Sequence, residues 1–282
     1  MTIREYRNRF IAELEAHYGR EEAESFFYLT LEDFRGLKRV DLALNPEFPL
    51  ADEELAGWDF VLAQLKKETP IQYILGKTHF FGLEFEVNEN VLIPRPETEE
   101  LVSWILSDTQ IHKSSPKILD IGTGSGCIAI ALAKNLPNAR VYAIDVSQGA
   151  LTVAKRNAER NGVTVNFLQK NILETNFLLE SFDIIVSNPP YVRELEKHEI
   201  KKNVLDHEPH LALFVSDDDA LLFYRKIADI AKGHVPKNGK LYFEINQYLA
   251  KETMDMLEQK GFSYLELHKD IYGNDRMILA KL

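Results

Sequence analysis

Residues 120–126 read DIGTGSG and stand at the end of a short apolar run. Three glycines occupy alternate positions, Gly122, Gly124 and Gly126, and glycine allows a backbone to approach a ligand closely. Another apolar run, residues 127–133, follows at once and suits a buried helix. The stretch therefore predicts a strand, a ligand-binding turn and a helix in succession.

The spacing of these glycines argues against a nicotinamide cofactor, whose fingerprint needs glycine at the first, third and sixth positions. Counted from Gly122 the sixth position is Cys127, and counted from Gly124 it is Ala129. Alternate glycines after an acidic residue instead resemble the cofactor loop of class I S-adenosylmethionine methyltransferases. The resemblance implies that five loop residues bind this cofactor: Gly122, Thr123, Gly124, Ser125 and Gly126.

Three residues further along are candidates for the rest of that cofactor. Asp145 ends the next apolar run, where a carboxylate can accept both ribose hydroxyls, although a carboxylate at a strand end is equally often a helix cap. After the third strand the family usually has an acidic residue, and this chain has Asn171. Its amide oxygen can accept from the adenine amino group, with Ile172 packing on the ring.

The C-terminal two thirds of the chain alternate apolar runs with helical stretches, which is typical of a parallel sheet with helices on both faces. Pro96 followed by several glutamates marks the first helix. We predict an α/β, Rossmann-like domain over residues 96–282, with the last two of its strands paired as an antiparallel hairpin. The seven expected strands are residues 117–121, 140–144, 163–168, 182–187, 240–245, 262–267 and 276–281.

The N-terminal part has a different pattern. Apolar residues at helical spacing, many of them aromatic, predict a small helical bundle whose core they fill, as domain 1–76. Alternating apolar residues from Leu83 to Val87, with turn-prone residues 88–90 after them, predict a β-hairpin linker over residues 77–95.

Composition excludes several classes of protein. The chain has 282 residues, a formal net charge of −11 and a single cysteine, so it can form no internal disulfide and no thiolate zinc cluster. The histidines show no metal-ligand spacing, and we expect no metal. The acidic balance disfavours direct nucleic-acid binding. Its apolar runs are too short to cross a bilayer, so we expect no membrane partner and a cytoplasmic location.

The fourth apolar run ends in the tetrapeptide NPPY. Each proline holds the preceding residue in an extended conformation and has no N–H of its own, so nearby carbonyls stay free. The side-chain oxygen of Asn188 and the carbonyl of Pro189 can then accept the two hydrogens of a primary amide or amine, and Tyr191 can flank its plane. We predict a catalytic site, with Asn188 also touching the cofactor, made of Asn188, Pro189, Pro190 and Tyr191.

With its flanking motifs, the chain is similar over nearly its whole length to the HemK/PrmC family of release-factor glutamine methyltransferases. The motifs are PIQYILG at residues 70–76, IPRPETE at residues 93–99, the glycine loop, NPPY and Glu208-Pro209. The resemblance implies S-adenosylmethionine as cofactor and class I release factors as partners. The methylated atom would be N5 of the glutamine in their Gly-Gly-Gln loop, and the helical domain would recognise the substrate. We expect a monomer.

Three local features leave alternatives open. The family's glycine-rich stretch is replaced by VSDDD at residues 215–219, which puts the loop shape in doubt. Arg95 either borders the active site or forms a salt bridge at the domain junction. Residues 193–207 either fold over substrate or, as we prefer, form a solvated mobile loop.

The tetrapeptide alone does not fix the substrate. Adenine-N6 methyltransferases of nucleic acids and ribosomal-protein glutamine methyltransferases share it, because all three substrates present a planar amide or amino nitrogen. A non-catalytic cofactor-binding scaffold is a further alternative, and the intact tetrapeptide argues against it.

Overall fold

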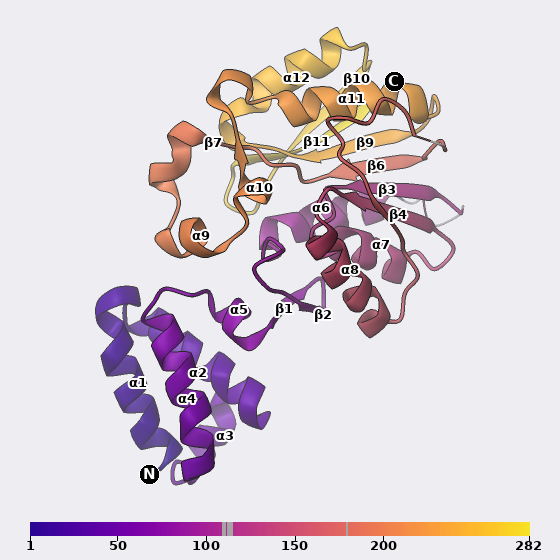
Figure 1. The fold of residues 1–282 in the computed structure, drawn as a ribbon. Helices are drawn as coiled ribbons and strands as arrows, with labels where there is room; N and C mark the ends of the chain where they lie inside the picture. Colours follow the sequence, from indigo (N-terminus) through magenta and orange to yellow (C-terminus); the bar gives the residue numbers. More distant parts are fainter. Residues whose placement is uncertain (109–110, 112–114, 179) are drawn as a thin grey trace. The chain divides into compact units, whose positions relative to one another are not determined.

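The computed structural model describes residues 1–108, 111, 115–178 and 180–282. The chain forms two compact units, which Figure 1 colours along the sequence. One contains Met1–Gly76 together with Lys202–His207. The other contains Lys77–Lys201 and Glu208–Leu282.

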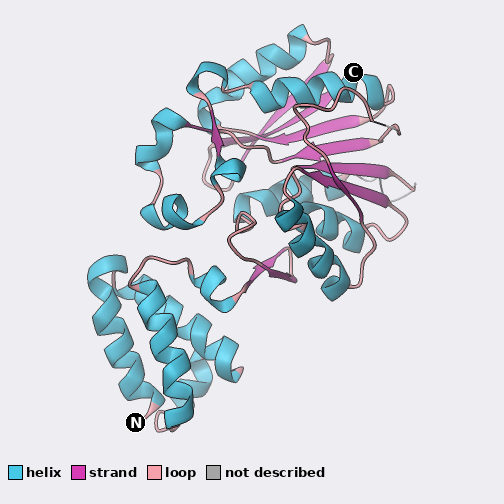
Figure 2. Ribbon diagram, viewed as in Figure 1, coloured by secondary structure: helices cyan, strands magenta, loops and turns pink. Residues whose placement is uncertain are grey.

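The first unit is helical, as the apolar spacing predicts (Figure 2). Thr2 begins the first helix with a capping box, in which its hydroxyl accepts from the N–H of Glu5 at 3.1 Å and its own N–H donates to the Glu5 carboxylate at 2.8 Å. The helices are α1 (Ile3–Tyr18), α2 (Arg20–Arg35), α3 (Arg39–Leu44), α4 (Asp52–Leu65) and α5 (Ile71–Leu75).

Aromatic side chains fill the core of this unit, as expected. The buried Trp58 ring lies 5.5 Å from that of Tyr6, edge on, and 5.3 Å from that of Phe27. The Tyr6 hydroxyl donates to Asp59 at 2.8 Å, so this buried ring keeps a partner for its polar end. Phe34 and Phe60 are exceptions among the aromatic residues of this unit, since 40% and 55% of them are exposed.

The segment expected to be a loop, residues 193–207, contains two short helices, so that expectation was wrong. The 3-10 helix η2 (Glu194–Glu199) is held by the buried Glu196, which accepts from the Arg193 N–H at 2.8 Å and from Asn246 Nδ2 at 2.9 Å. A carboxylate that is buried with several donors fixes a segment whose outer residues are polar. The polar sequence of this segment gives no sign that Glu196 is buried and fixes it.

The second helix of that segment, α9 (Lys202–His207), packs with the helical unit. Lys202 Nζ lies 3.2 Å from the Glu68 carboxylate, and His207 Nε2 lies 3.3 Å from the Lys67 carbonyl oxygen. A part of the chain that follows NPPY therefore belongs to the N-terminal unit.

The second unit is built on the expected seven-stranded sheet, with the expected antiparallel hairpin at one edge. Five strands are parallel, and β11 pairs antiparallel with both neighbours. In spatial order the strands are β10 (Tyr264–Lys269), β11 (Asp275–Lys281), β9 (Lys240–Glu244), β6 (Ile184–Ser187), β3 (Lys117–Ile121), β4 (Arg140–Asp145) and β5 (Asn166–Gln169).

Three strands begin later than predicted: β5 by three residues, and β6 and β10 by two residues each. For β5 the reason is local. Gly162 ends the preceding helix in the left-handed conformation, and the N–H of Val163 donates back to Ala158 at 3.1 Å. This helix-ending bond occupies the residues that would otherwise begin β5.

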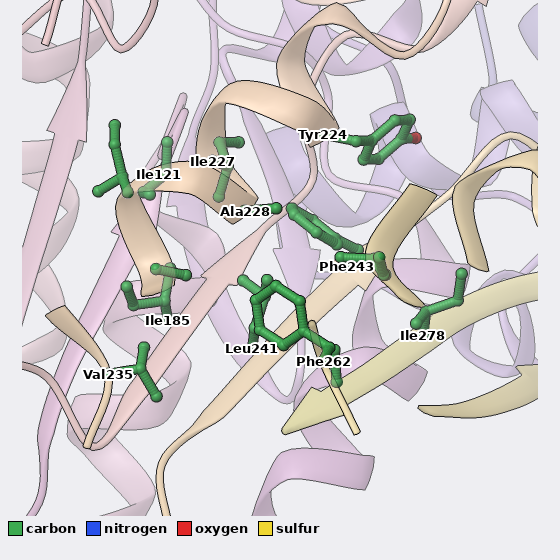
Figure 3. Close-up of a cluster of buried hydrophobic side chains, with 14 of the residues drawn as sticks. Ile121, Ile185, Tyr224, Ile227, Ala228, Val235, Leu241, Phe243, Phe262 and Ile278 are labelled. Atoms are coloured by element: carbon green, nitrogen blue, oxygen red, sulfur yellow. The ribbon is translucent and has the colours of Figure 1, made fainter. Parts of the chain in front are cut away.

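Helices cover both faces of the sheet (Figures 1 and 2). One face is covered by α6 (Pro96–Ser107), α7 (Cys127–Asn135) and α8 (Gln148–Asn161), and the other by α11 (Leu222–His234) and α12 (Ala250–Gln259). Figure 3 shows the core under α11 and α12, where aliphatic and aromatic side chains of the helices meet those of the strands.

Short elements complete the unit at the edge of the sheet that carries the motifs. Two-residue strands β7 and β8 pair in parallel. Ser216 caps the 3-10 helix η3, which lies within the VSDDD stretch of residues 215–219. The elements are β7 (Val192–Arg193), α10 (His210–Leu213), β8 (Phe214–Val215), η3 (Asp217–Asp219) and η4 (Gln247–Leu249).

The predicted linker contains a hairpin, which belongs to the second unit, and its turn lies earlier than predicted. Strands β1 (Lys77–Phe80) and β2 (Leu83–Glu86) are joined by Phe81 and Gly82, with φ values of 51° and 72°. Two consecutive positive φ angles are typical of a type I′ turn, whose twist matches that of the flanking strands. This turn usually carries Asn-Gly. Phenylalanine in the first position hid it, and the turn-prone residues 88–90 instead follow the hairpin.

Asn157 ties this hairpin to the glycine loop. Its side chain is fully buried on α8, where its oxygen accepts from the Glu86 N–H at 2.6 Å. Its amide nitrogen donates to the carbonyls of Glu86 at 3.0 Å and Ser125 at 2.9 Å. One side chain therefore fixes the linker and the loop against the same helix.

We expect Asn157→Ala to lower the free energy of unfolding by about 1–3 kcal/mol or more, because buried backbone groups lose their partners. Denaturant unfolding followed by circular dichroism measures this. Lys155→Ala, on the exposed side of the same helix, should change it by less than about 0.5 kcal/mol. Equal stabilities for the two variants would contradict this role.

Candidate active site

The two principal motifs leave adjacent parallel strands. The glycine loop follows β3, NPPY follows β6, and the two strands pair with Ile121 opposite Ser187. Strand order reverses here, because β3 lies between β4 and β6. In open α/β sheets a crevice for ligands forms beyond the strand ends at such a switch point.

A cavity of about 260 Å³ lies at this position, with every lining residue in the second unit. Two predicted site residues, Gly126 and Tyr191, lie outside its lining. The predicted residues that line it are Gly122, Thr123, Gly124, Ser125, Asp145, Asn171, Ile172, Asn188, Pro189 and Pro190.

The glycine loop requires glycine for two physical reasons. Gly122, Gly124 and Gly126 all have positive φ, at 75°, 55° and 84°. At Gly126 a Cβ atom would also come within 2.8 Å of Ile130 and 3.1 Å of Ala154. The loop therefore packs tightly on α7 and α8, while its backbone faces the cavity just before the N-terminus of α7.

Asp145 holds two parts of the cavity wall. Its carboxylate accepts from the Gly124 N–H and from the Ser147 N–H, both at 2.9 Å. Burial raises its pKa, and these backbone donors oppose the shift. A carboxylate has about four acceptor sites, so it can still receive two hydroxyl groups of a ligand.

Asn171 and Ile172 form the neighbouring wall. The Asn171 side-chain oxygen accepts from the Leu173 N–H at 3.0 Å, which turns the chain after β5. One lone pair of that oxygen is thereby used, and the other remains. Ile172 is buried and belongs to the core under α11, so its side chain gives the cavity an apolar surface.

The tetrapeptide is held from several directions. The Ser187 hydroxyl donates to the Ile121 carbonyl at 2.7 Å, and Asn246 Nδ2 donates to the Tyr191 carbonyl at 3.0 Å. Asn188 Nδ2 donates to the Thr98 hydroxyl at 3.2 Å. No described residue donates to Asn188 Oδ1 or to the Pro189 carbonyl, so two acceptors remain at the cavity for a ligand with two N–H groups.

Two residues behind this motif escaped sequence reasoning. Thr98 lines the cavity from α6, and Glu244 ends β9 with 1% of its surface exposed. Glu244 accepts from the Thr98 hydroxyl at 2.6 Å and from the Tyr191 hydroxyl at 3.1 Å. A carboxylate at the end of a strand was the signal available for Glu244, as it was for Asp145.

Arg95 fulfils both of its proposed roles in part, since it lines the cavity and forms a salt bridge. Its guanidinium lies 2.6 Å from the carboxylate of the buried Glu208, within the second unit. The other oxygen of Glu208 accepts from the Ile93 N–H at 3.2 Å. This pairing joins the IPRPETE and Glu-Pro motifs.

Comparison with known proteins decides the family. A model described as PrmC N-terminal domain matches residues 5–76, and one described as Methyltransferase small domain matches residues 100–211. A release factor glutamine methyltransferase of Flavobacterium psychrophilum is 61% identical, covering 99% of this chain and 98% of that protein. The chain belongs to the release factor glutamine methyltransferase family. A relative of the same name in Bacteroides thetaiotaomicron is 43% identical, covering 93% and 94%.

Solved structures confirm the class I methyltransferase fold. A methyltransferase from Pyrococcus furiosus matches with a TM-score of 0.52 and 22% identity, over 82% of this chain and 98% of that one. A 16S rRNA N2 G1207 methyltransferase of Thermus thermophilus, in complex with AdoMet and guanosine, matches with a TM-score of 0.53 and 17% identity, over 73% and 49%.

The cavity fits the S-adenosylmethionine expected for this family. The Ser125 hydroxyl is buried in its wall without a hydrogen-bond partner in the described part of the chain, and thus offers a polar contact. Positive-φ glycines keep the loop free of side chains, and Asp145 supplies acceptors for hydroxyl groups. The residues present therefore suit a ligand with a polar tail and a ribose.

Within the described ranges, no group of three His, Cys, Asp or Glu residues is arranged to hold a metal ion. No helix in these ranges is long and apolar enough to cross a membrane.

Asp120 should make stability depend on pH. Burial raises its pKa to about 7, whereas an exposed aspartate has a pKa of about 3.9. Well below pH 4 the Asp120 carboxyl is neutral in both the folded and the unfolded protein. As pH rises to about 7 the unfolded chain releases its proton first, so the free energy of unfolding falls.

We expect Asp120→Asn, which can still accept from the Thr123 hydroxyl, to remove this contribution. The difference in free energy of unfolding, parent minus variant, should decrease between pH 4 and pH 7. Urea titrations at several pH values measure it. A difference that does not change with pH would show that Asp120 titrates normally.

Proposed function

We propose that this enzyme transfers the methyl group of S-adenosylmethionine to N5 of the glutamine in the Gly-Gly-Gln loop of class I release factors. The observation that carries the proposal is the pair of free acceptors, Asn188 Oδ1 and the Pro189 carbonyl, beside the cofactor loop. Their number matches the two hydrogens of a primary amide. The names of the relatives support the protein substrate.

An amide nitrogen is a weak nucleophile, because its lone pair is delocalised into the carbonyl group. The two acceptors bind its hydrogens, polarise the N–H bonds and fix the nitrogen in one place. Tyr191 lies outside the cavity lining and donates its hydroxyl to Glu244, and the two prolines keep the tetrapeptide rigid. When bound, S-adenosylmethionine supplies an electrophilic methyl group on a sulfonium centre.

We assign the cofactor to the part of the cavity formed by the glycine loop and the ends of β4 and β5. Residues 122–125 of the glycine loop face its amino-acid part, with Gly126 packed behind them on α7 and α8, and Asp145 accepts from the ribose hydroxyls. Asn171 and Ile172 bind the adenine, the first through the remaining lone pair of its oxygen and the second by packing. Asn188 stands where cofactor and substrate meet.

The remaining proposals concern the whole protein. The helical domain, residues 1–76, recognises the release factor outside its tripeptide, which suits a separate compact unit that matches its own family model. We also propose that the enzyme acts as a monomer. Because release factors act on ribosomes, we propose that the enzyme acts in the cytoplasm.

Ribosomal-protein glutamine and adenine amino groups fit the same two acceptors. The net charge of −11 disfavours the nucleic acid, because repulsion from its phosphates opposes binding. The ribosomal-protein alternative differs from our proposal only in the partner.

We expect labelled S-adenosylmethionine and release factor to give a methyl group on the Gly-Gly-Gln glutamine, located by peptide mass spectrometry. A release factor with alanine in place of this glutamine should accept none. Asn188→Ala should lower the rate at least about 100-fold, because one of the two acceptors is lost. Preferential transfer to ribosomal protein or to nucleic acid would overturn the proposed substrate.

The role of the helical domain predicts a pattern of hydrogen exchange. Adding intact release factor should slow amide exchange in α1–α5, because binding stabilises and covers those helices. A short peptide that contains Gly-Gly-Gln should slow exchange only around the cavity. No protection of residues 1–76 by the intact factor would contradict substrate recognition by this domain.

A further inference from the structure

A buried chain of hydrogen bonds runs from the end of β9 to the catalytic asparagine. Glu244 accepts from Thr98 Oγ1 at 2.6 Å, and Thr98 Oγ1 accepts in turn from Asn188 Nδ2 at 3.2 Å. Thr98 and Glu244 are 2% and 1% exposed, so water does not compete for these groups. None of the site functions assigned above uses the carboxylate.

The donors and acceptors of Glu244, Thr98 and Asn188 give this chain of hydrogen bonds one direction. Both oxygens of Glu244 accept hydrogen bonds, one from Thr98 and the other from Tyr191, so the single hydroxyl hydrogen of Thr98 points to Glu244. The hydroxyl then has only lone pairs left for Asn188, which must face it with its NH2 group. The amide oxygen of Asn188 is thereby turned the other way.

We propose that Glu244 is a positioning residue that selects the orientation of the Asn188 amide through Thr98, so that the cavity receives an acceptor and not a donor. The inference rests on the proposed function, in which Asn188 Oδ1 binds one hydrogen of the substrate amide. If the Asn188 amide group were rotated by 180°, its NH2 group would face the NH2 group of the substrate, and the two donors would repel each other.

The surroundings keep Glu244 suited to this task. The Tyr191 hydroxyl donates to its second oxygen at 3.1 Å, so each oxygen has one donor. Burial raises the pKa of Glu244, and the positive charge of Arg276 opposes that shift and favours the ionised form. Arg276 is itself fixed by the buried Asp270 at 3.1 Å.

Substitutions of the middle residue test the inference. Thr98→Val keeps the shape but removes the hydroxyl, and should lower kcat about 10- to 100-fold with the cofactor Kd changed less than about threefold. Thr98→Ser restores the hydroxyl and should stay within about threefold of the parent. A parental kcat for Thr98→Val, or an equally large loss of cofactor affinity, would overturn the proposal.

Reversing the direction of this chain of hydrogen bonds gives a sharper test. In Asn188→Asp, two acceptor-only carboxylates compete for the one Thr98 hydrogen, so activity should fall. Adding Glu244→Gln supplies an NH2 group that donates to Thr98, whose hydrogen can then turn to the aspartate. The double variant should recover kcat at least about tenfold over Asn188→Asp, and equal or lower activity would refute the proposed direction.

A measurement without release factor separates this inference from the proposed function. In protein labelled with 15N-asparagine, the Asn188 side-chain NH2 protons should show nuclear Overhauser contacts to the Thr98 side chain. Their absence from the folded parent protein overturns the orientation, whether or not release factor is methylated. Methyl transfer to another substrate, with these contacts present, overturns only the proposed function.

Discussion

The parallel pairing of β3 with β6 is the constraint on which the site depends. Ile121 lies opposite Ser187, and the Ser187 hydroxyl donates to the Ile121 carbonyl at 2.7 Å, so the two strands end in register. The glycine loop and NPPY begin at those ends. A shift of one residue would exchange the faces of the side chains and separate the cofactor loop from the amide acceptors.

Much of this arrangement could be predicted from the sequence, because its signals are local. Three alternate glycines permit unusual backbone angles, whereas two adjacent prolines and a proline at a helix start restrict the backbone, and the structure places each in the expected element. The strands of a doubly wound sheet are short apolar runs, and these were found nearly at their observed bounds. Such signals need no information about distant parts of the chain.

The features that were missed depend on long-range contacts. Thr98 and Glu244 are 146 positions apart, and nothing in the sequence around either residue indicates that the two meet. Residues 193–207 look like a polar loop until Glu196 meets Asn246, 50 positions away. The hairpin turn was missed for a local reason, since Phe81 adopts a positive φ that a bulky residue rarely takes.

The buried polar groups explain how weak acceptors can serve catalysis. Neutral amide and carbonyl oxygens stabilise charge less than an ionised group would, so their benefit depends on being oriented before the substrate arrives. Burying Glu244 is costly, and a well-packed apolar residue in its place could make the fold more stable. An amide side chain can present either its oxygen or its NH2 group to a ligand with little difference in shape. The buried carboxylate offsets its cost in stability by fixing the direction of a hydrogen-bond chain that ends on Asn188, and so by fixing which of the two groups faces the cavity.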